Sequence, residues 1–191
     1  MKNRIRFSVS PGFPVLLSVL LCLGGPGTAL PFLLAAAVHE AGHLAALGLL
    51  GVPVTRIELR GSGAVIRAGL RGEPREAWAA AAGPAANLLL AGAVYRILPM
   101  LSFCSMLLCC FNLLPAASLD GGMICRLLLP KLFGTAGYVL CKLLHWGVVL
   151  SAAAAGVWGT CVLHLGLLPA LLAGIFLLRL PNLLDKAAIN C

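Results

Sequence analysis

The chain has 191 residues, of which 61% are hydrophobic and 10% are charged. Because soluble domains usually carry about 25% charged residues, this composition excludes an ordinary soluble protein and indicates one compact bundle in a membrane. The net charge of +8 does not indicate nucleic-acid binding, because the basic residues are scattered in short segments between apolar runs, as membrane topology requires.

Six apolar segments are expected to enter or cross the membrane. The predicted fold class is therefore an all-α polytopic membrane protein of about six transmembrane helices, with residues 1–191 forming one membrane-embedded domain. The first segment is short and contains Pro14. Because Lys2, Arg4 and Arg6 precede it and GGPGTA follows it, a cleaved signal peptide is an alternative to a re-entrant or short spanning helix. The segments cover about residues 12–24, 29–50, 77–98, 100–115, 135–158 and 160–178.

The basic residues indicate which side of the membrane each loop faces, because cytoplasmic loops are enriched in Lys and Arg. If the N-terminus is cytoplasmic, twelve of the 14 basic residues lie in cytoplasmic segments. Of the other two, Arg96 lies outside, and Lys142 lies in a helix near its cytoplasmic end. We therefore predict a multi-pass membrane protein whose N- and C-termini are both cytoplasmic.

The stretch VTRIELRGSGAVIRAG (54–69) departs from the apolar pattern and is predicted to form a small β-hairpin on the cytoplasmic side. Ile57 and Leu59 alternate with charged residues, and glycines at 61 and 63 favour a turn between two strands. Such a ribbon is expected to leave one edge unpaired, near Glu58 or Val65, which an extended peptide could join by strand addition.

The pentapeptide HEAGH (39–43) places three ionisable side chains inside the second apolar segment. Residues four apart share a helix face, so His39 and His43 can bind one metal ion, and Glu40 can reach a water on that ion. HExxH on a helix is typical of zinc hydrolases. Packed histidines beside a hydrogen-bonded glutamate are less favoured, because ionisable groups at membrane depth are costly and usually functional.

Zinc needs a third protein ligand and one position open to water. Asp120 is favoured because it follows a helix broken by Pro115 and precedes two glycines that allow close backbone approach. The second and fourth segments also run in the same direction, which places HEAGH and Asp120 at similar depth near the cytoplasmic face. The alternatives are His145 and His164, each alone on an apolar helix, and Asp185 in the C-terminal tail.

These motifs resemble those of the site-2 protease family of intramembrane zinc metalloproteases. The resemblance rests on HEAGH (39–43), on Asn112-Leu-Leu-Pro115 and on Leu119-Asp120-Gly121, and AGPAANL (82–88) resembles the Gly-Pro-x-x-Asn segment of that family. The hairpin and the number of segments resemble the bacterial subgroup around stage IV sporulation protein FB.

The resemblance implies a zinc-dependent endopeptidase of the bacterial cell membrane, with one zinc ion held by His39, His43 and Asp120 and with Glu40 as general base. Asn112 is a candidate to bind the substrate backbone or the oxyanion. The substrate would be a membrane-associated or membrane-spanning protein, with a sporulation pro-sigma factor as one candidate, cut near the cytoplasmic face. Membrane regulatory proteins are further candidate partners, and the oligomeric state stays open.

Two other classes of function are weighed against this one. A chaperone or regulator that has lost catalysis would not need to retain His39, Glu40, His43 and Asp120 together. A zinc or proton transporter would need polar residues along several helices at successive depths. The remaining segments are almost entirely Leu, Ala, Val and Gly, so the polar groups indicate one site and no path.

Overall fold

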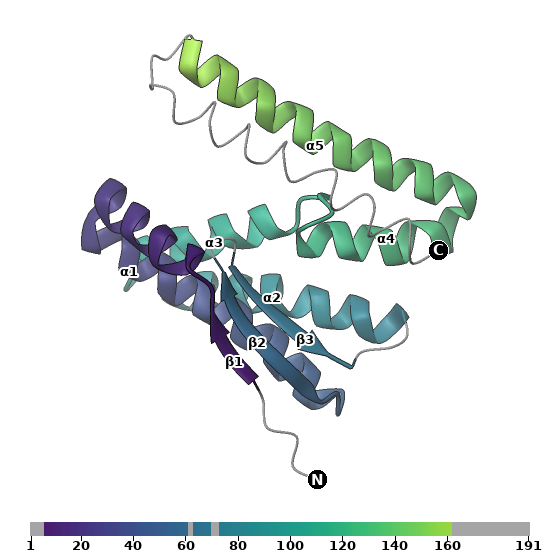
Figure 1. The fold of residues 1–191 in the computed structure, drawn as a ribbon, viewed down its shortest axis with the longest axis horizontal. Coiled ribbons are helices and arrows are strands. Elements are labelled where there is room, and N and C mark those ends of the chain that lie inside the picture. Colours follow the sequence, from purple (N-terminus) through teal and green to yellow (C-terminus); the bar gives the residue numbers. More distant parts are fainter. Residues whose placement is uncertain (1–5, 61–62, 70–72, 162–191) are drawn as a thin grey trace. The chain divides into compact units, whose positions relative to one another are not determined.

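The computed structural model describes residues 6–60, 63–69 and 73–161, which form two compact units divided after Leu113 (Figure 1). The first unit contains β1 (Arg6–Val9), α1 (Gly12–Leu49), β2 (Val54–Arg60), β3 (Gly63–Ala68), α2 (Glu73–Val94) and α3 (Pro99–Asn112). The second contains α4 (Asp120–Phe133) and α5 (Thr135–Cys161).

Helix α1 joins the first two predicted segments into one element of 38 residues. The break expected between them is a kink at Gly25, whose φ of 63° lies in the left-handed region that glycine tolerates. Pro26 follows and lacks the N–H that would continue the helical ladder. The sequence therefore located the interruption, but the chain bends there and does not form a loop.

The predicted hairpin is confirmed as β2 and β3, an antiparallel pair with Glu58 opposite Val65. The sequence analysis missed β1, which pairs in parallel with β2 and brings Ser8 opposite Glu58. The sheet order is β1-β2-β3, so β2 is the central strand. Glu58 therefore does not lie on a free edge, and the expectation that it might serve strand addition is corrected. The two edges of the sheet are β1 and β3.

Among the described residues, three helices are long and apolar enough to cross a membrane: Gly24–Leu49, Pro74–Val94 and Thr135–Cys161. Helix α3 has 14 residues, and at 1.5 Å per residue it is about 21 Å long, shorter than the roughly 30 Å hydrocarbon core of a bilayer. The last predicted segment, 160–178, lies almost wholly outside the described residues. The count of six transmembrane helices is thus not confirmed.

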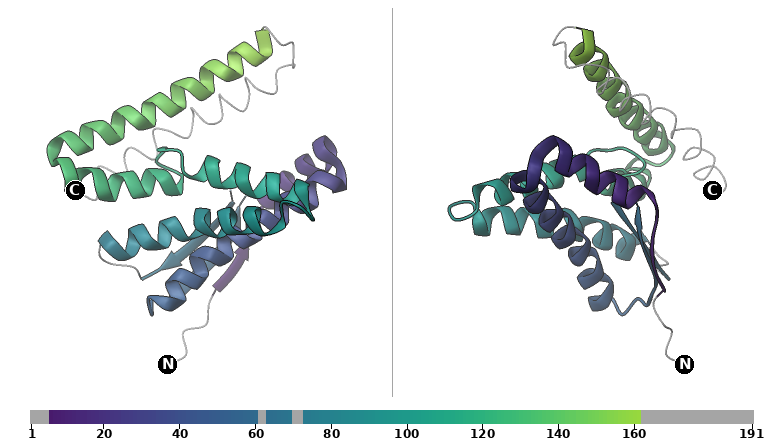
Figure 2. Two further views of the ribbon diagram at one scale, coloured as in Figure 1. Left: turned by 180° about the vertical axis from the view of Figure 1, so that it is seen from behind. Right: turned by 60° about the vertical axis from the view of Figure 1, so that its left-hand side comes forward.

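Helix α2 packs closely against the second half of α1, as both views in Figure 2 show. A Cβ atom on Gly42 would lie 2.6 Å from the Ala82 carbonyl oxygen and 2.8 Å from the Ala86 Cβ atom. Small residues at such a contact let two helix backbones approach each other. Nearer the end of α2, Ser102 of α3 donates a hydrogen bond of 2.8 Å to the Ala91 carbonyl.

The core of the first unit is apolar and is shared by α1, α2 and α3. Ala35, Leu101 and Cys104 are buried at its centre, and Leu90 and Val94 of α2 pack against them. This core holds α2 in a fixed position beside the histidines of α1.

The second unit contains a helix that the sequence analysis did not predict, because residues 120–133, between the fourth and fifth apolar segments, form α4. Gly134, with a φ of 56°, ends α4 and allows the chain to turn directly into α5. Gly137 of α5 then lies so close to the Leu129 carbonyl that no side chain would fit between them. The two helices form a tight antiparallel pair.

Candidate metal centre

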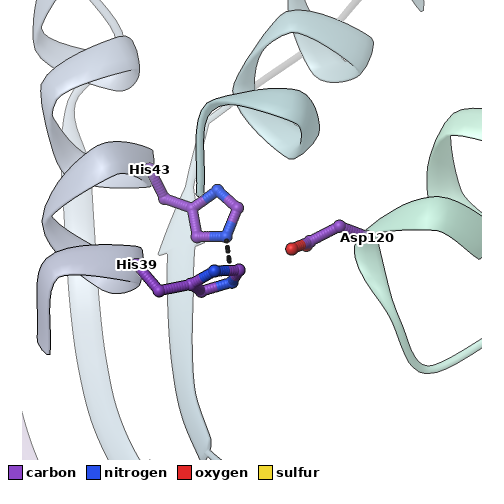
Figure 3. Close-up of side chains that lie close together, drawn as sticks. All are labelled: His39, His43 and Asp120. Atoms are coloured by element: carbon purple, nitrogen blue, oxygen red, sulfur yellow. Dashed lines mark hydrogen bonds between the residues drawn. The ribbon is translucent and has the colours of Figure 1, made fainter. Parts of the chain in front are cut away.

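His39 and His43 project from successive turns of α1 toward the same point (Figure 3). His39 is buried and His43 is half-buried, on a helix stretch of membrane-spanning length. An isolated pair of imidazoles in such apolar surroundings would be costly unless its nitrogen atoms had partners. The contacts of each ring therefore indicate what the pair can do.

The ring of His43 is fixed by the backbone of α2. Its Nδ1 atom lies 2.7 Å from the carbonyl oxygen of Ala79. A carbonyl oxygen can only accept, so Nδ1 carries the proton and donates it. The Nε2 atom of the neutral ring then keeps its lone pair, which is the form of histidine that binds a metal.

The ring of His39 is contacted by a side chain of α2. Asn87, two turns after Ala79 on α2, is fully buried, and its Nδ2 atom lies 3.4 Å from Nδ1 of His39. The two ring contacts therefore place the Nδ1 atoms of both histidines against α2. Both Nε2 atoms point away from these contacts and toward each other.

The Nε2 atoms of His39 and His43 are 3.1 Å apart. Two imidazole nitrogens on a tetrahedral zinc, each about 2.0–2.1 Å from the metal, are about 3.3 Å apart. The observed separation fits that requirement closely, and the two rings stand at 84° to each other with centroids 4.7 Å apart. The residues present therefore fit a zinc ion held through two Nε2 atoms.

Gly83 lies between Ala79 and Asn87 on the same face of α2 and faces both rings. A Cβ atom there would collide with Nε2 of His43 and would lie 2.8 Å from Cε1 of His39. The absence of a side chain at this position keeps the metal-binding edges of the imidazoles open. The AGPAANL stretch was the sequence signal for this face, but the sequence alone did not show which of its residues meet the histidines.

Glu40 and Asn112, the other predicted site residues of the first unit, are both half-buried. Glu40 follows His39 directly on α1. Asn112 is the last residue of α3, and its Nδ2 atom donates a hydrogen bond of 3.0 Å to the Leu108 carbonyl of the same helix. One of the two amide N–H groups of Asn112 thus supports the end of α3.

Asp120 lies in the second unit, half-buried in the first turn of α4. Helix α5 fixes the segment before Asp120, because the Ala117 N–H donates a hydrogen bond of 3.1 Å to Nδ1 of buried His145. Gly122 lies against the Ala116 carbonyl with no room for a side chain. His145, considered above as a metal ligand, therefore uses one ring nitrogen to fix this segment, whereas His164 and Asp185 lie outside the described residues.

The two imidazoles lie on a helix of membrane-spanning length, and their Nε2 atoms are placed to bind one metal ion. They define a candidate intramembrane metal centre. Residues 92–150, which include Asn112 and Asp120, match the model of Peptidase family M50. The structure is similar to that of the site-2 protease from Methanocaldococcus jannaschii, with a TM-score of 0.67 and 20% sequence identity, covering 91% of this chain and 87% of that chain. No curated protein matches the sequence. The chain thus has the fold of a site-2 protease.

Proposed function

We propose that the protein is an intramembrane zinc metalloendopeptidase that hydrolyses a peptide bond of a membrane protein. The observation that supports this most directly is the pair of Nε2 atoms 3.1 Å apart, with the Nδ1 atom of His43 held by the Ala79 carbonyl. The M50 match and the site-2 protease fold support the same class of activity.

The third zinc ligand in this proposal is Asp120, the residue favoured by the sequence motif Leu119-Asp120-Gly121. A carboxylate completes a two-histidine zinc set and leaves the fourth position for water or substrate. The segment 112–122 that carries it lies within the part of the chain that matches the M50 peptidases. The tight fit of Gly122 under Ala116 and the His145 contact both hold the start of α4 in place.

The chain's own residues would perform the proton transfers. Zinc, when bound, polarises a carbonyl oxygen and lowers the pKa of a water molecule to about 7. Glu40 accepts the proton of the attacking water and returns it to the departing amine nitrogen. Asn112 has a second amide N–H and a carbonyl oxygen with which to bind an extended substrate backbone.

The substrate would have to be unwound locally, because a helix hides its carbonyl groups. The free edge of β3 offers backbone groups that an extended segment could pair with. We further propose that the protein lies in the bacterial cell membrane with both termini cytoplasmic and cuts near that face. The subgroup of stage IV sporulation protein FB and a pro-sigma factor substrate receive no support from the comparisons, so the proposal extends only to a membrane protein substrate.

Metal analysis of the purified protein, followed by reconstitution in liposomes, tests this function. We expect one zinc per chain, and cleavage that stops with a chelator and returns with zinc. Zinc flux across the liposome membrane without cleavage would favour the transporter class. A protein that binds no zinc, or that binds zinc and cuts no membrane protein, would contradict the proposal.

A further inference from the structure

Both imidazoles need a proton on Nδ1 if both are to bind a metal through Nε2. For His43 the requirement is met by the carbonyl oxygen of Ala79, which can only accept. For His39 the group that meets Nδ1 is the amide of Asn87. An amide can either donate through nitrogen or accept through oxygen, so its orientation decides which nitrogen of His39 keeps a lone pair.

We propose that Asn87 is a positioning residue that accepts the Nδ1 proton of His39 through its Oδ1 atom and thereby directs the Nε2 lone pair of His39 to the metal. The inference rests on the proposed zinc site and adds to it a residue on α2 that does not touch the metal. Together with Ala79 it makes α2 the element that selects the tautomer of both histidines.

The surroundings of Asn87 support this role. The side chain is fully buried, and its Oδ1 atom has no hydrogen-bond partner within the described part of the chain. A half-turn about the Cβ–Cγ bond exchanges Oδ1 and Nδ2 and gives the oxygen the Nδ1–H of His39 as its donor. An asparagine buried between apolar helices is costly unless it makes a specific hydrogen bond.

The spacing on α2 supports it as well. Ala79, Gly83 and Asn87 are each one helical turn apart, and all three face the histidines. Ala79 contacts His43 through its carbonyl oxygen, and Asn87 contacts His39 through its amide. Gly83 has no side chain and so leaves room for both rings. Gly83 lets α2 approach closely enough for Asn87 to reach Nδ1. Partners that orient ligand histidines are common in zinc sites, and their loss typically weakens metal binding by about 10–100-fold.

Two substitutions of Asn87 by residues of similar size test whether its side chain accepts a hydrogen bond from His39 or donates one to it. Asn87→Asp keeps an acceptor and removes the donor, whereas Asn87→Leu removes both. Ser105→Ala is the matched control, because Ser105 is fully buried in α3 and its Oγ atom also has no hydrogen-bond partner among the described residues. Zinc affinity, measured by competition with a chelator, and thermal unfolding in detergent are compared for all four proteins.

If Asn87 accepts from His39, the Asp variant and the Ser105 control bind zinc at least as tightly as wild type, and the Leu variant binds about 10–100-fold more weakly. If the Leu variant does not fold, Asn87→Ala takes its place with the same expectation. An Asp variant as weak as the Leu or Ala variant, or full zinc affinity in every variant, would overturn the inference. Failure of the wild-type protein itself to bind zinc would instead contradict the proposed function.

Discussion

The Nδ1 atom of His43 lies 2.7 Å from the carbonyl oxygen of Ala79, a residue 36 positions further along the chain. This contact joins the metal-binding face of α1 to the backbone of α2. Because the acceptor is a backbone group, no substitution at position 79 removes it directly. The position of α2, set by the close contacts at Gly42 and Gly83, is what can be tested.

Gly83→Ala should weaken zinc binding by at least about tenfold, because the added methyl group would occupy the space of His43 Nε2. The effect is measured by chelator competition. Gly92→Ala is the control on the same helix, since a Cβ atom there meets nothing within 4 Å. Equal zinc affinity in the two variants would show that the imidazoles do not use this face of α2.

Asp120→Asn should lower zinc affinity strongly, because a neutral amide is a weaker zinc ligand than a carboxylate. Asp185→Asn, which changes the only other aspartate in the chain, should leave zinc content unchanged. Atomic absorption on both purified variants makes the comparison. Unaltered zinc in the Asp120 variant would place the third ligand elsewhere, with His145 as the next candidate.

His145→Leu should reduce thermal stability and slow cleavage, because the Ala117 N–H loses a hydrogen bond worth about 0.5–1.5 kcal/mol. His145→Asn offers an oxygen near the position of Nδ1 and should recover part of both losses. Unfolding in detergent and cleavage rate are the two measurements. If the Leu and Asn variants behave alike, the hydrogen bond of 3.1 Å to Ala117 has no role in holding the segment before Asp120.

The edge of β3 can be tested with proline, which lacks an N–H donor. In an antiparallel pair the N–H groups of successive residues face opposite ways, so one of Val65 and Ile66 points its N–H outward from the sheet. A proline at the outward position should slow cleavage while zinc content and yield stay normal. Glu58→Pro, in the central strand, should lower yield instead.

If neither edge variant slows cleavage, strand addition at β3 is unsupported. The sheet would then be a structural cap on the first unit. Zinc content measured on the same samples separates a substrate effect from a disturbed metal centre.

The sequence predicted the parts of the fold whose signals are local. The hairpin followed from alternating side chains and glycines, and the interruption near Gly25 followed from clustered Gly and Pro. Strand β1 was missed because four residues, RFSV, carry no pattern of their own and pair with a strand about 50 positions away. Helix α4 was not predicted because Gly121, Gly122 and two basic residues interrupt the apolar pattern by which the other helices were found.

The sequence indicates candidate ligands for the site, but it does not indicate the tertiary contacts that support the two histidines. HEAGH indicates a metal because its chemistry depends on helical spacing alone. The contacts of Ala79, Gly83 and Asn87 depend on how α2 packs, and a backbone carbonyl or a missing side chain leaves no chemical signature in a sequence. His145 was weighed as a ligand for a similar reason, since its hydrogen bond to Ala117 is also a tertiary contact.

The most direct test of the account compares Glu40→Gln with wild type for zinc content and for cleavage of a membrane protein that co-purifies with the variant. Glutamine keeps the shape of glutamate but cannot accept a proton from water. We predict one zinc per chain in both proteins and a cleavage rate lowered by more than about 10²-fold in the variant. Near-normal turnover by the zinc-loaded Glu40→Gln protein would contradict its assignment as a metalloendopeptidase that uses this glutamate.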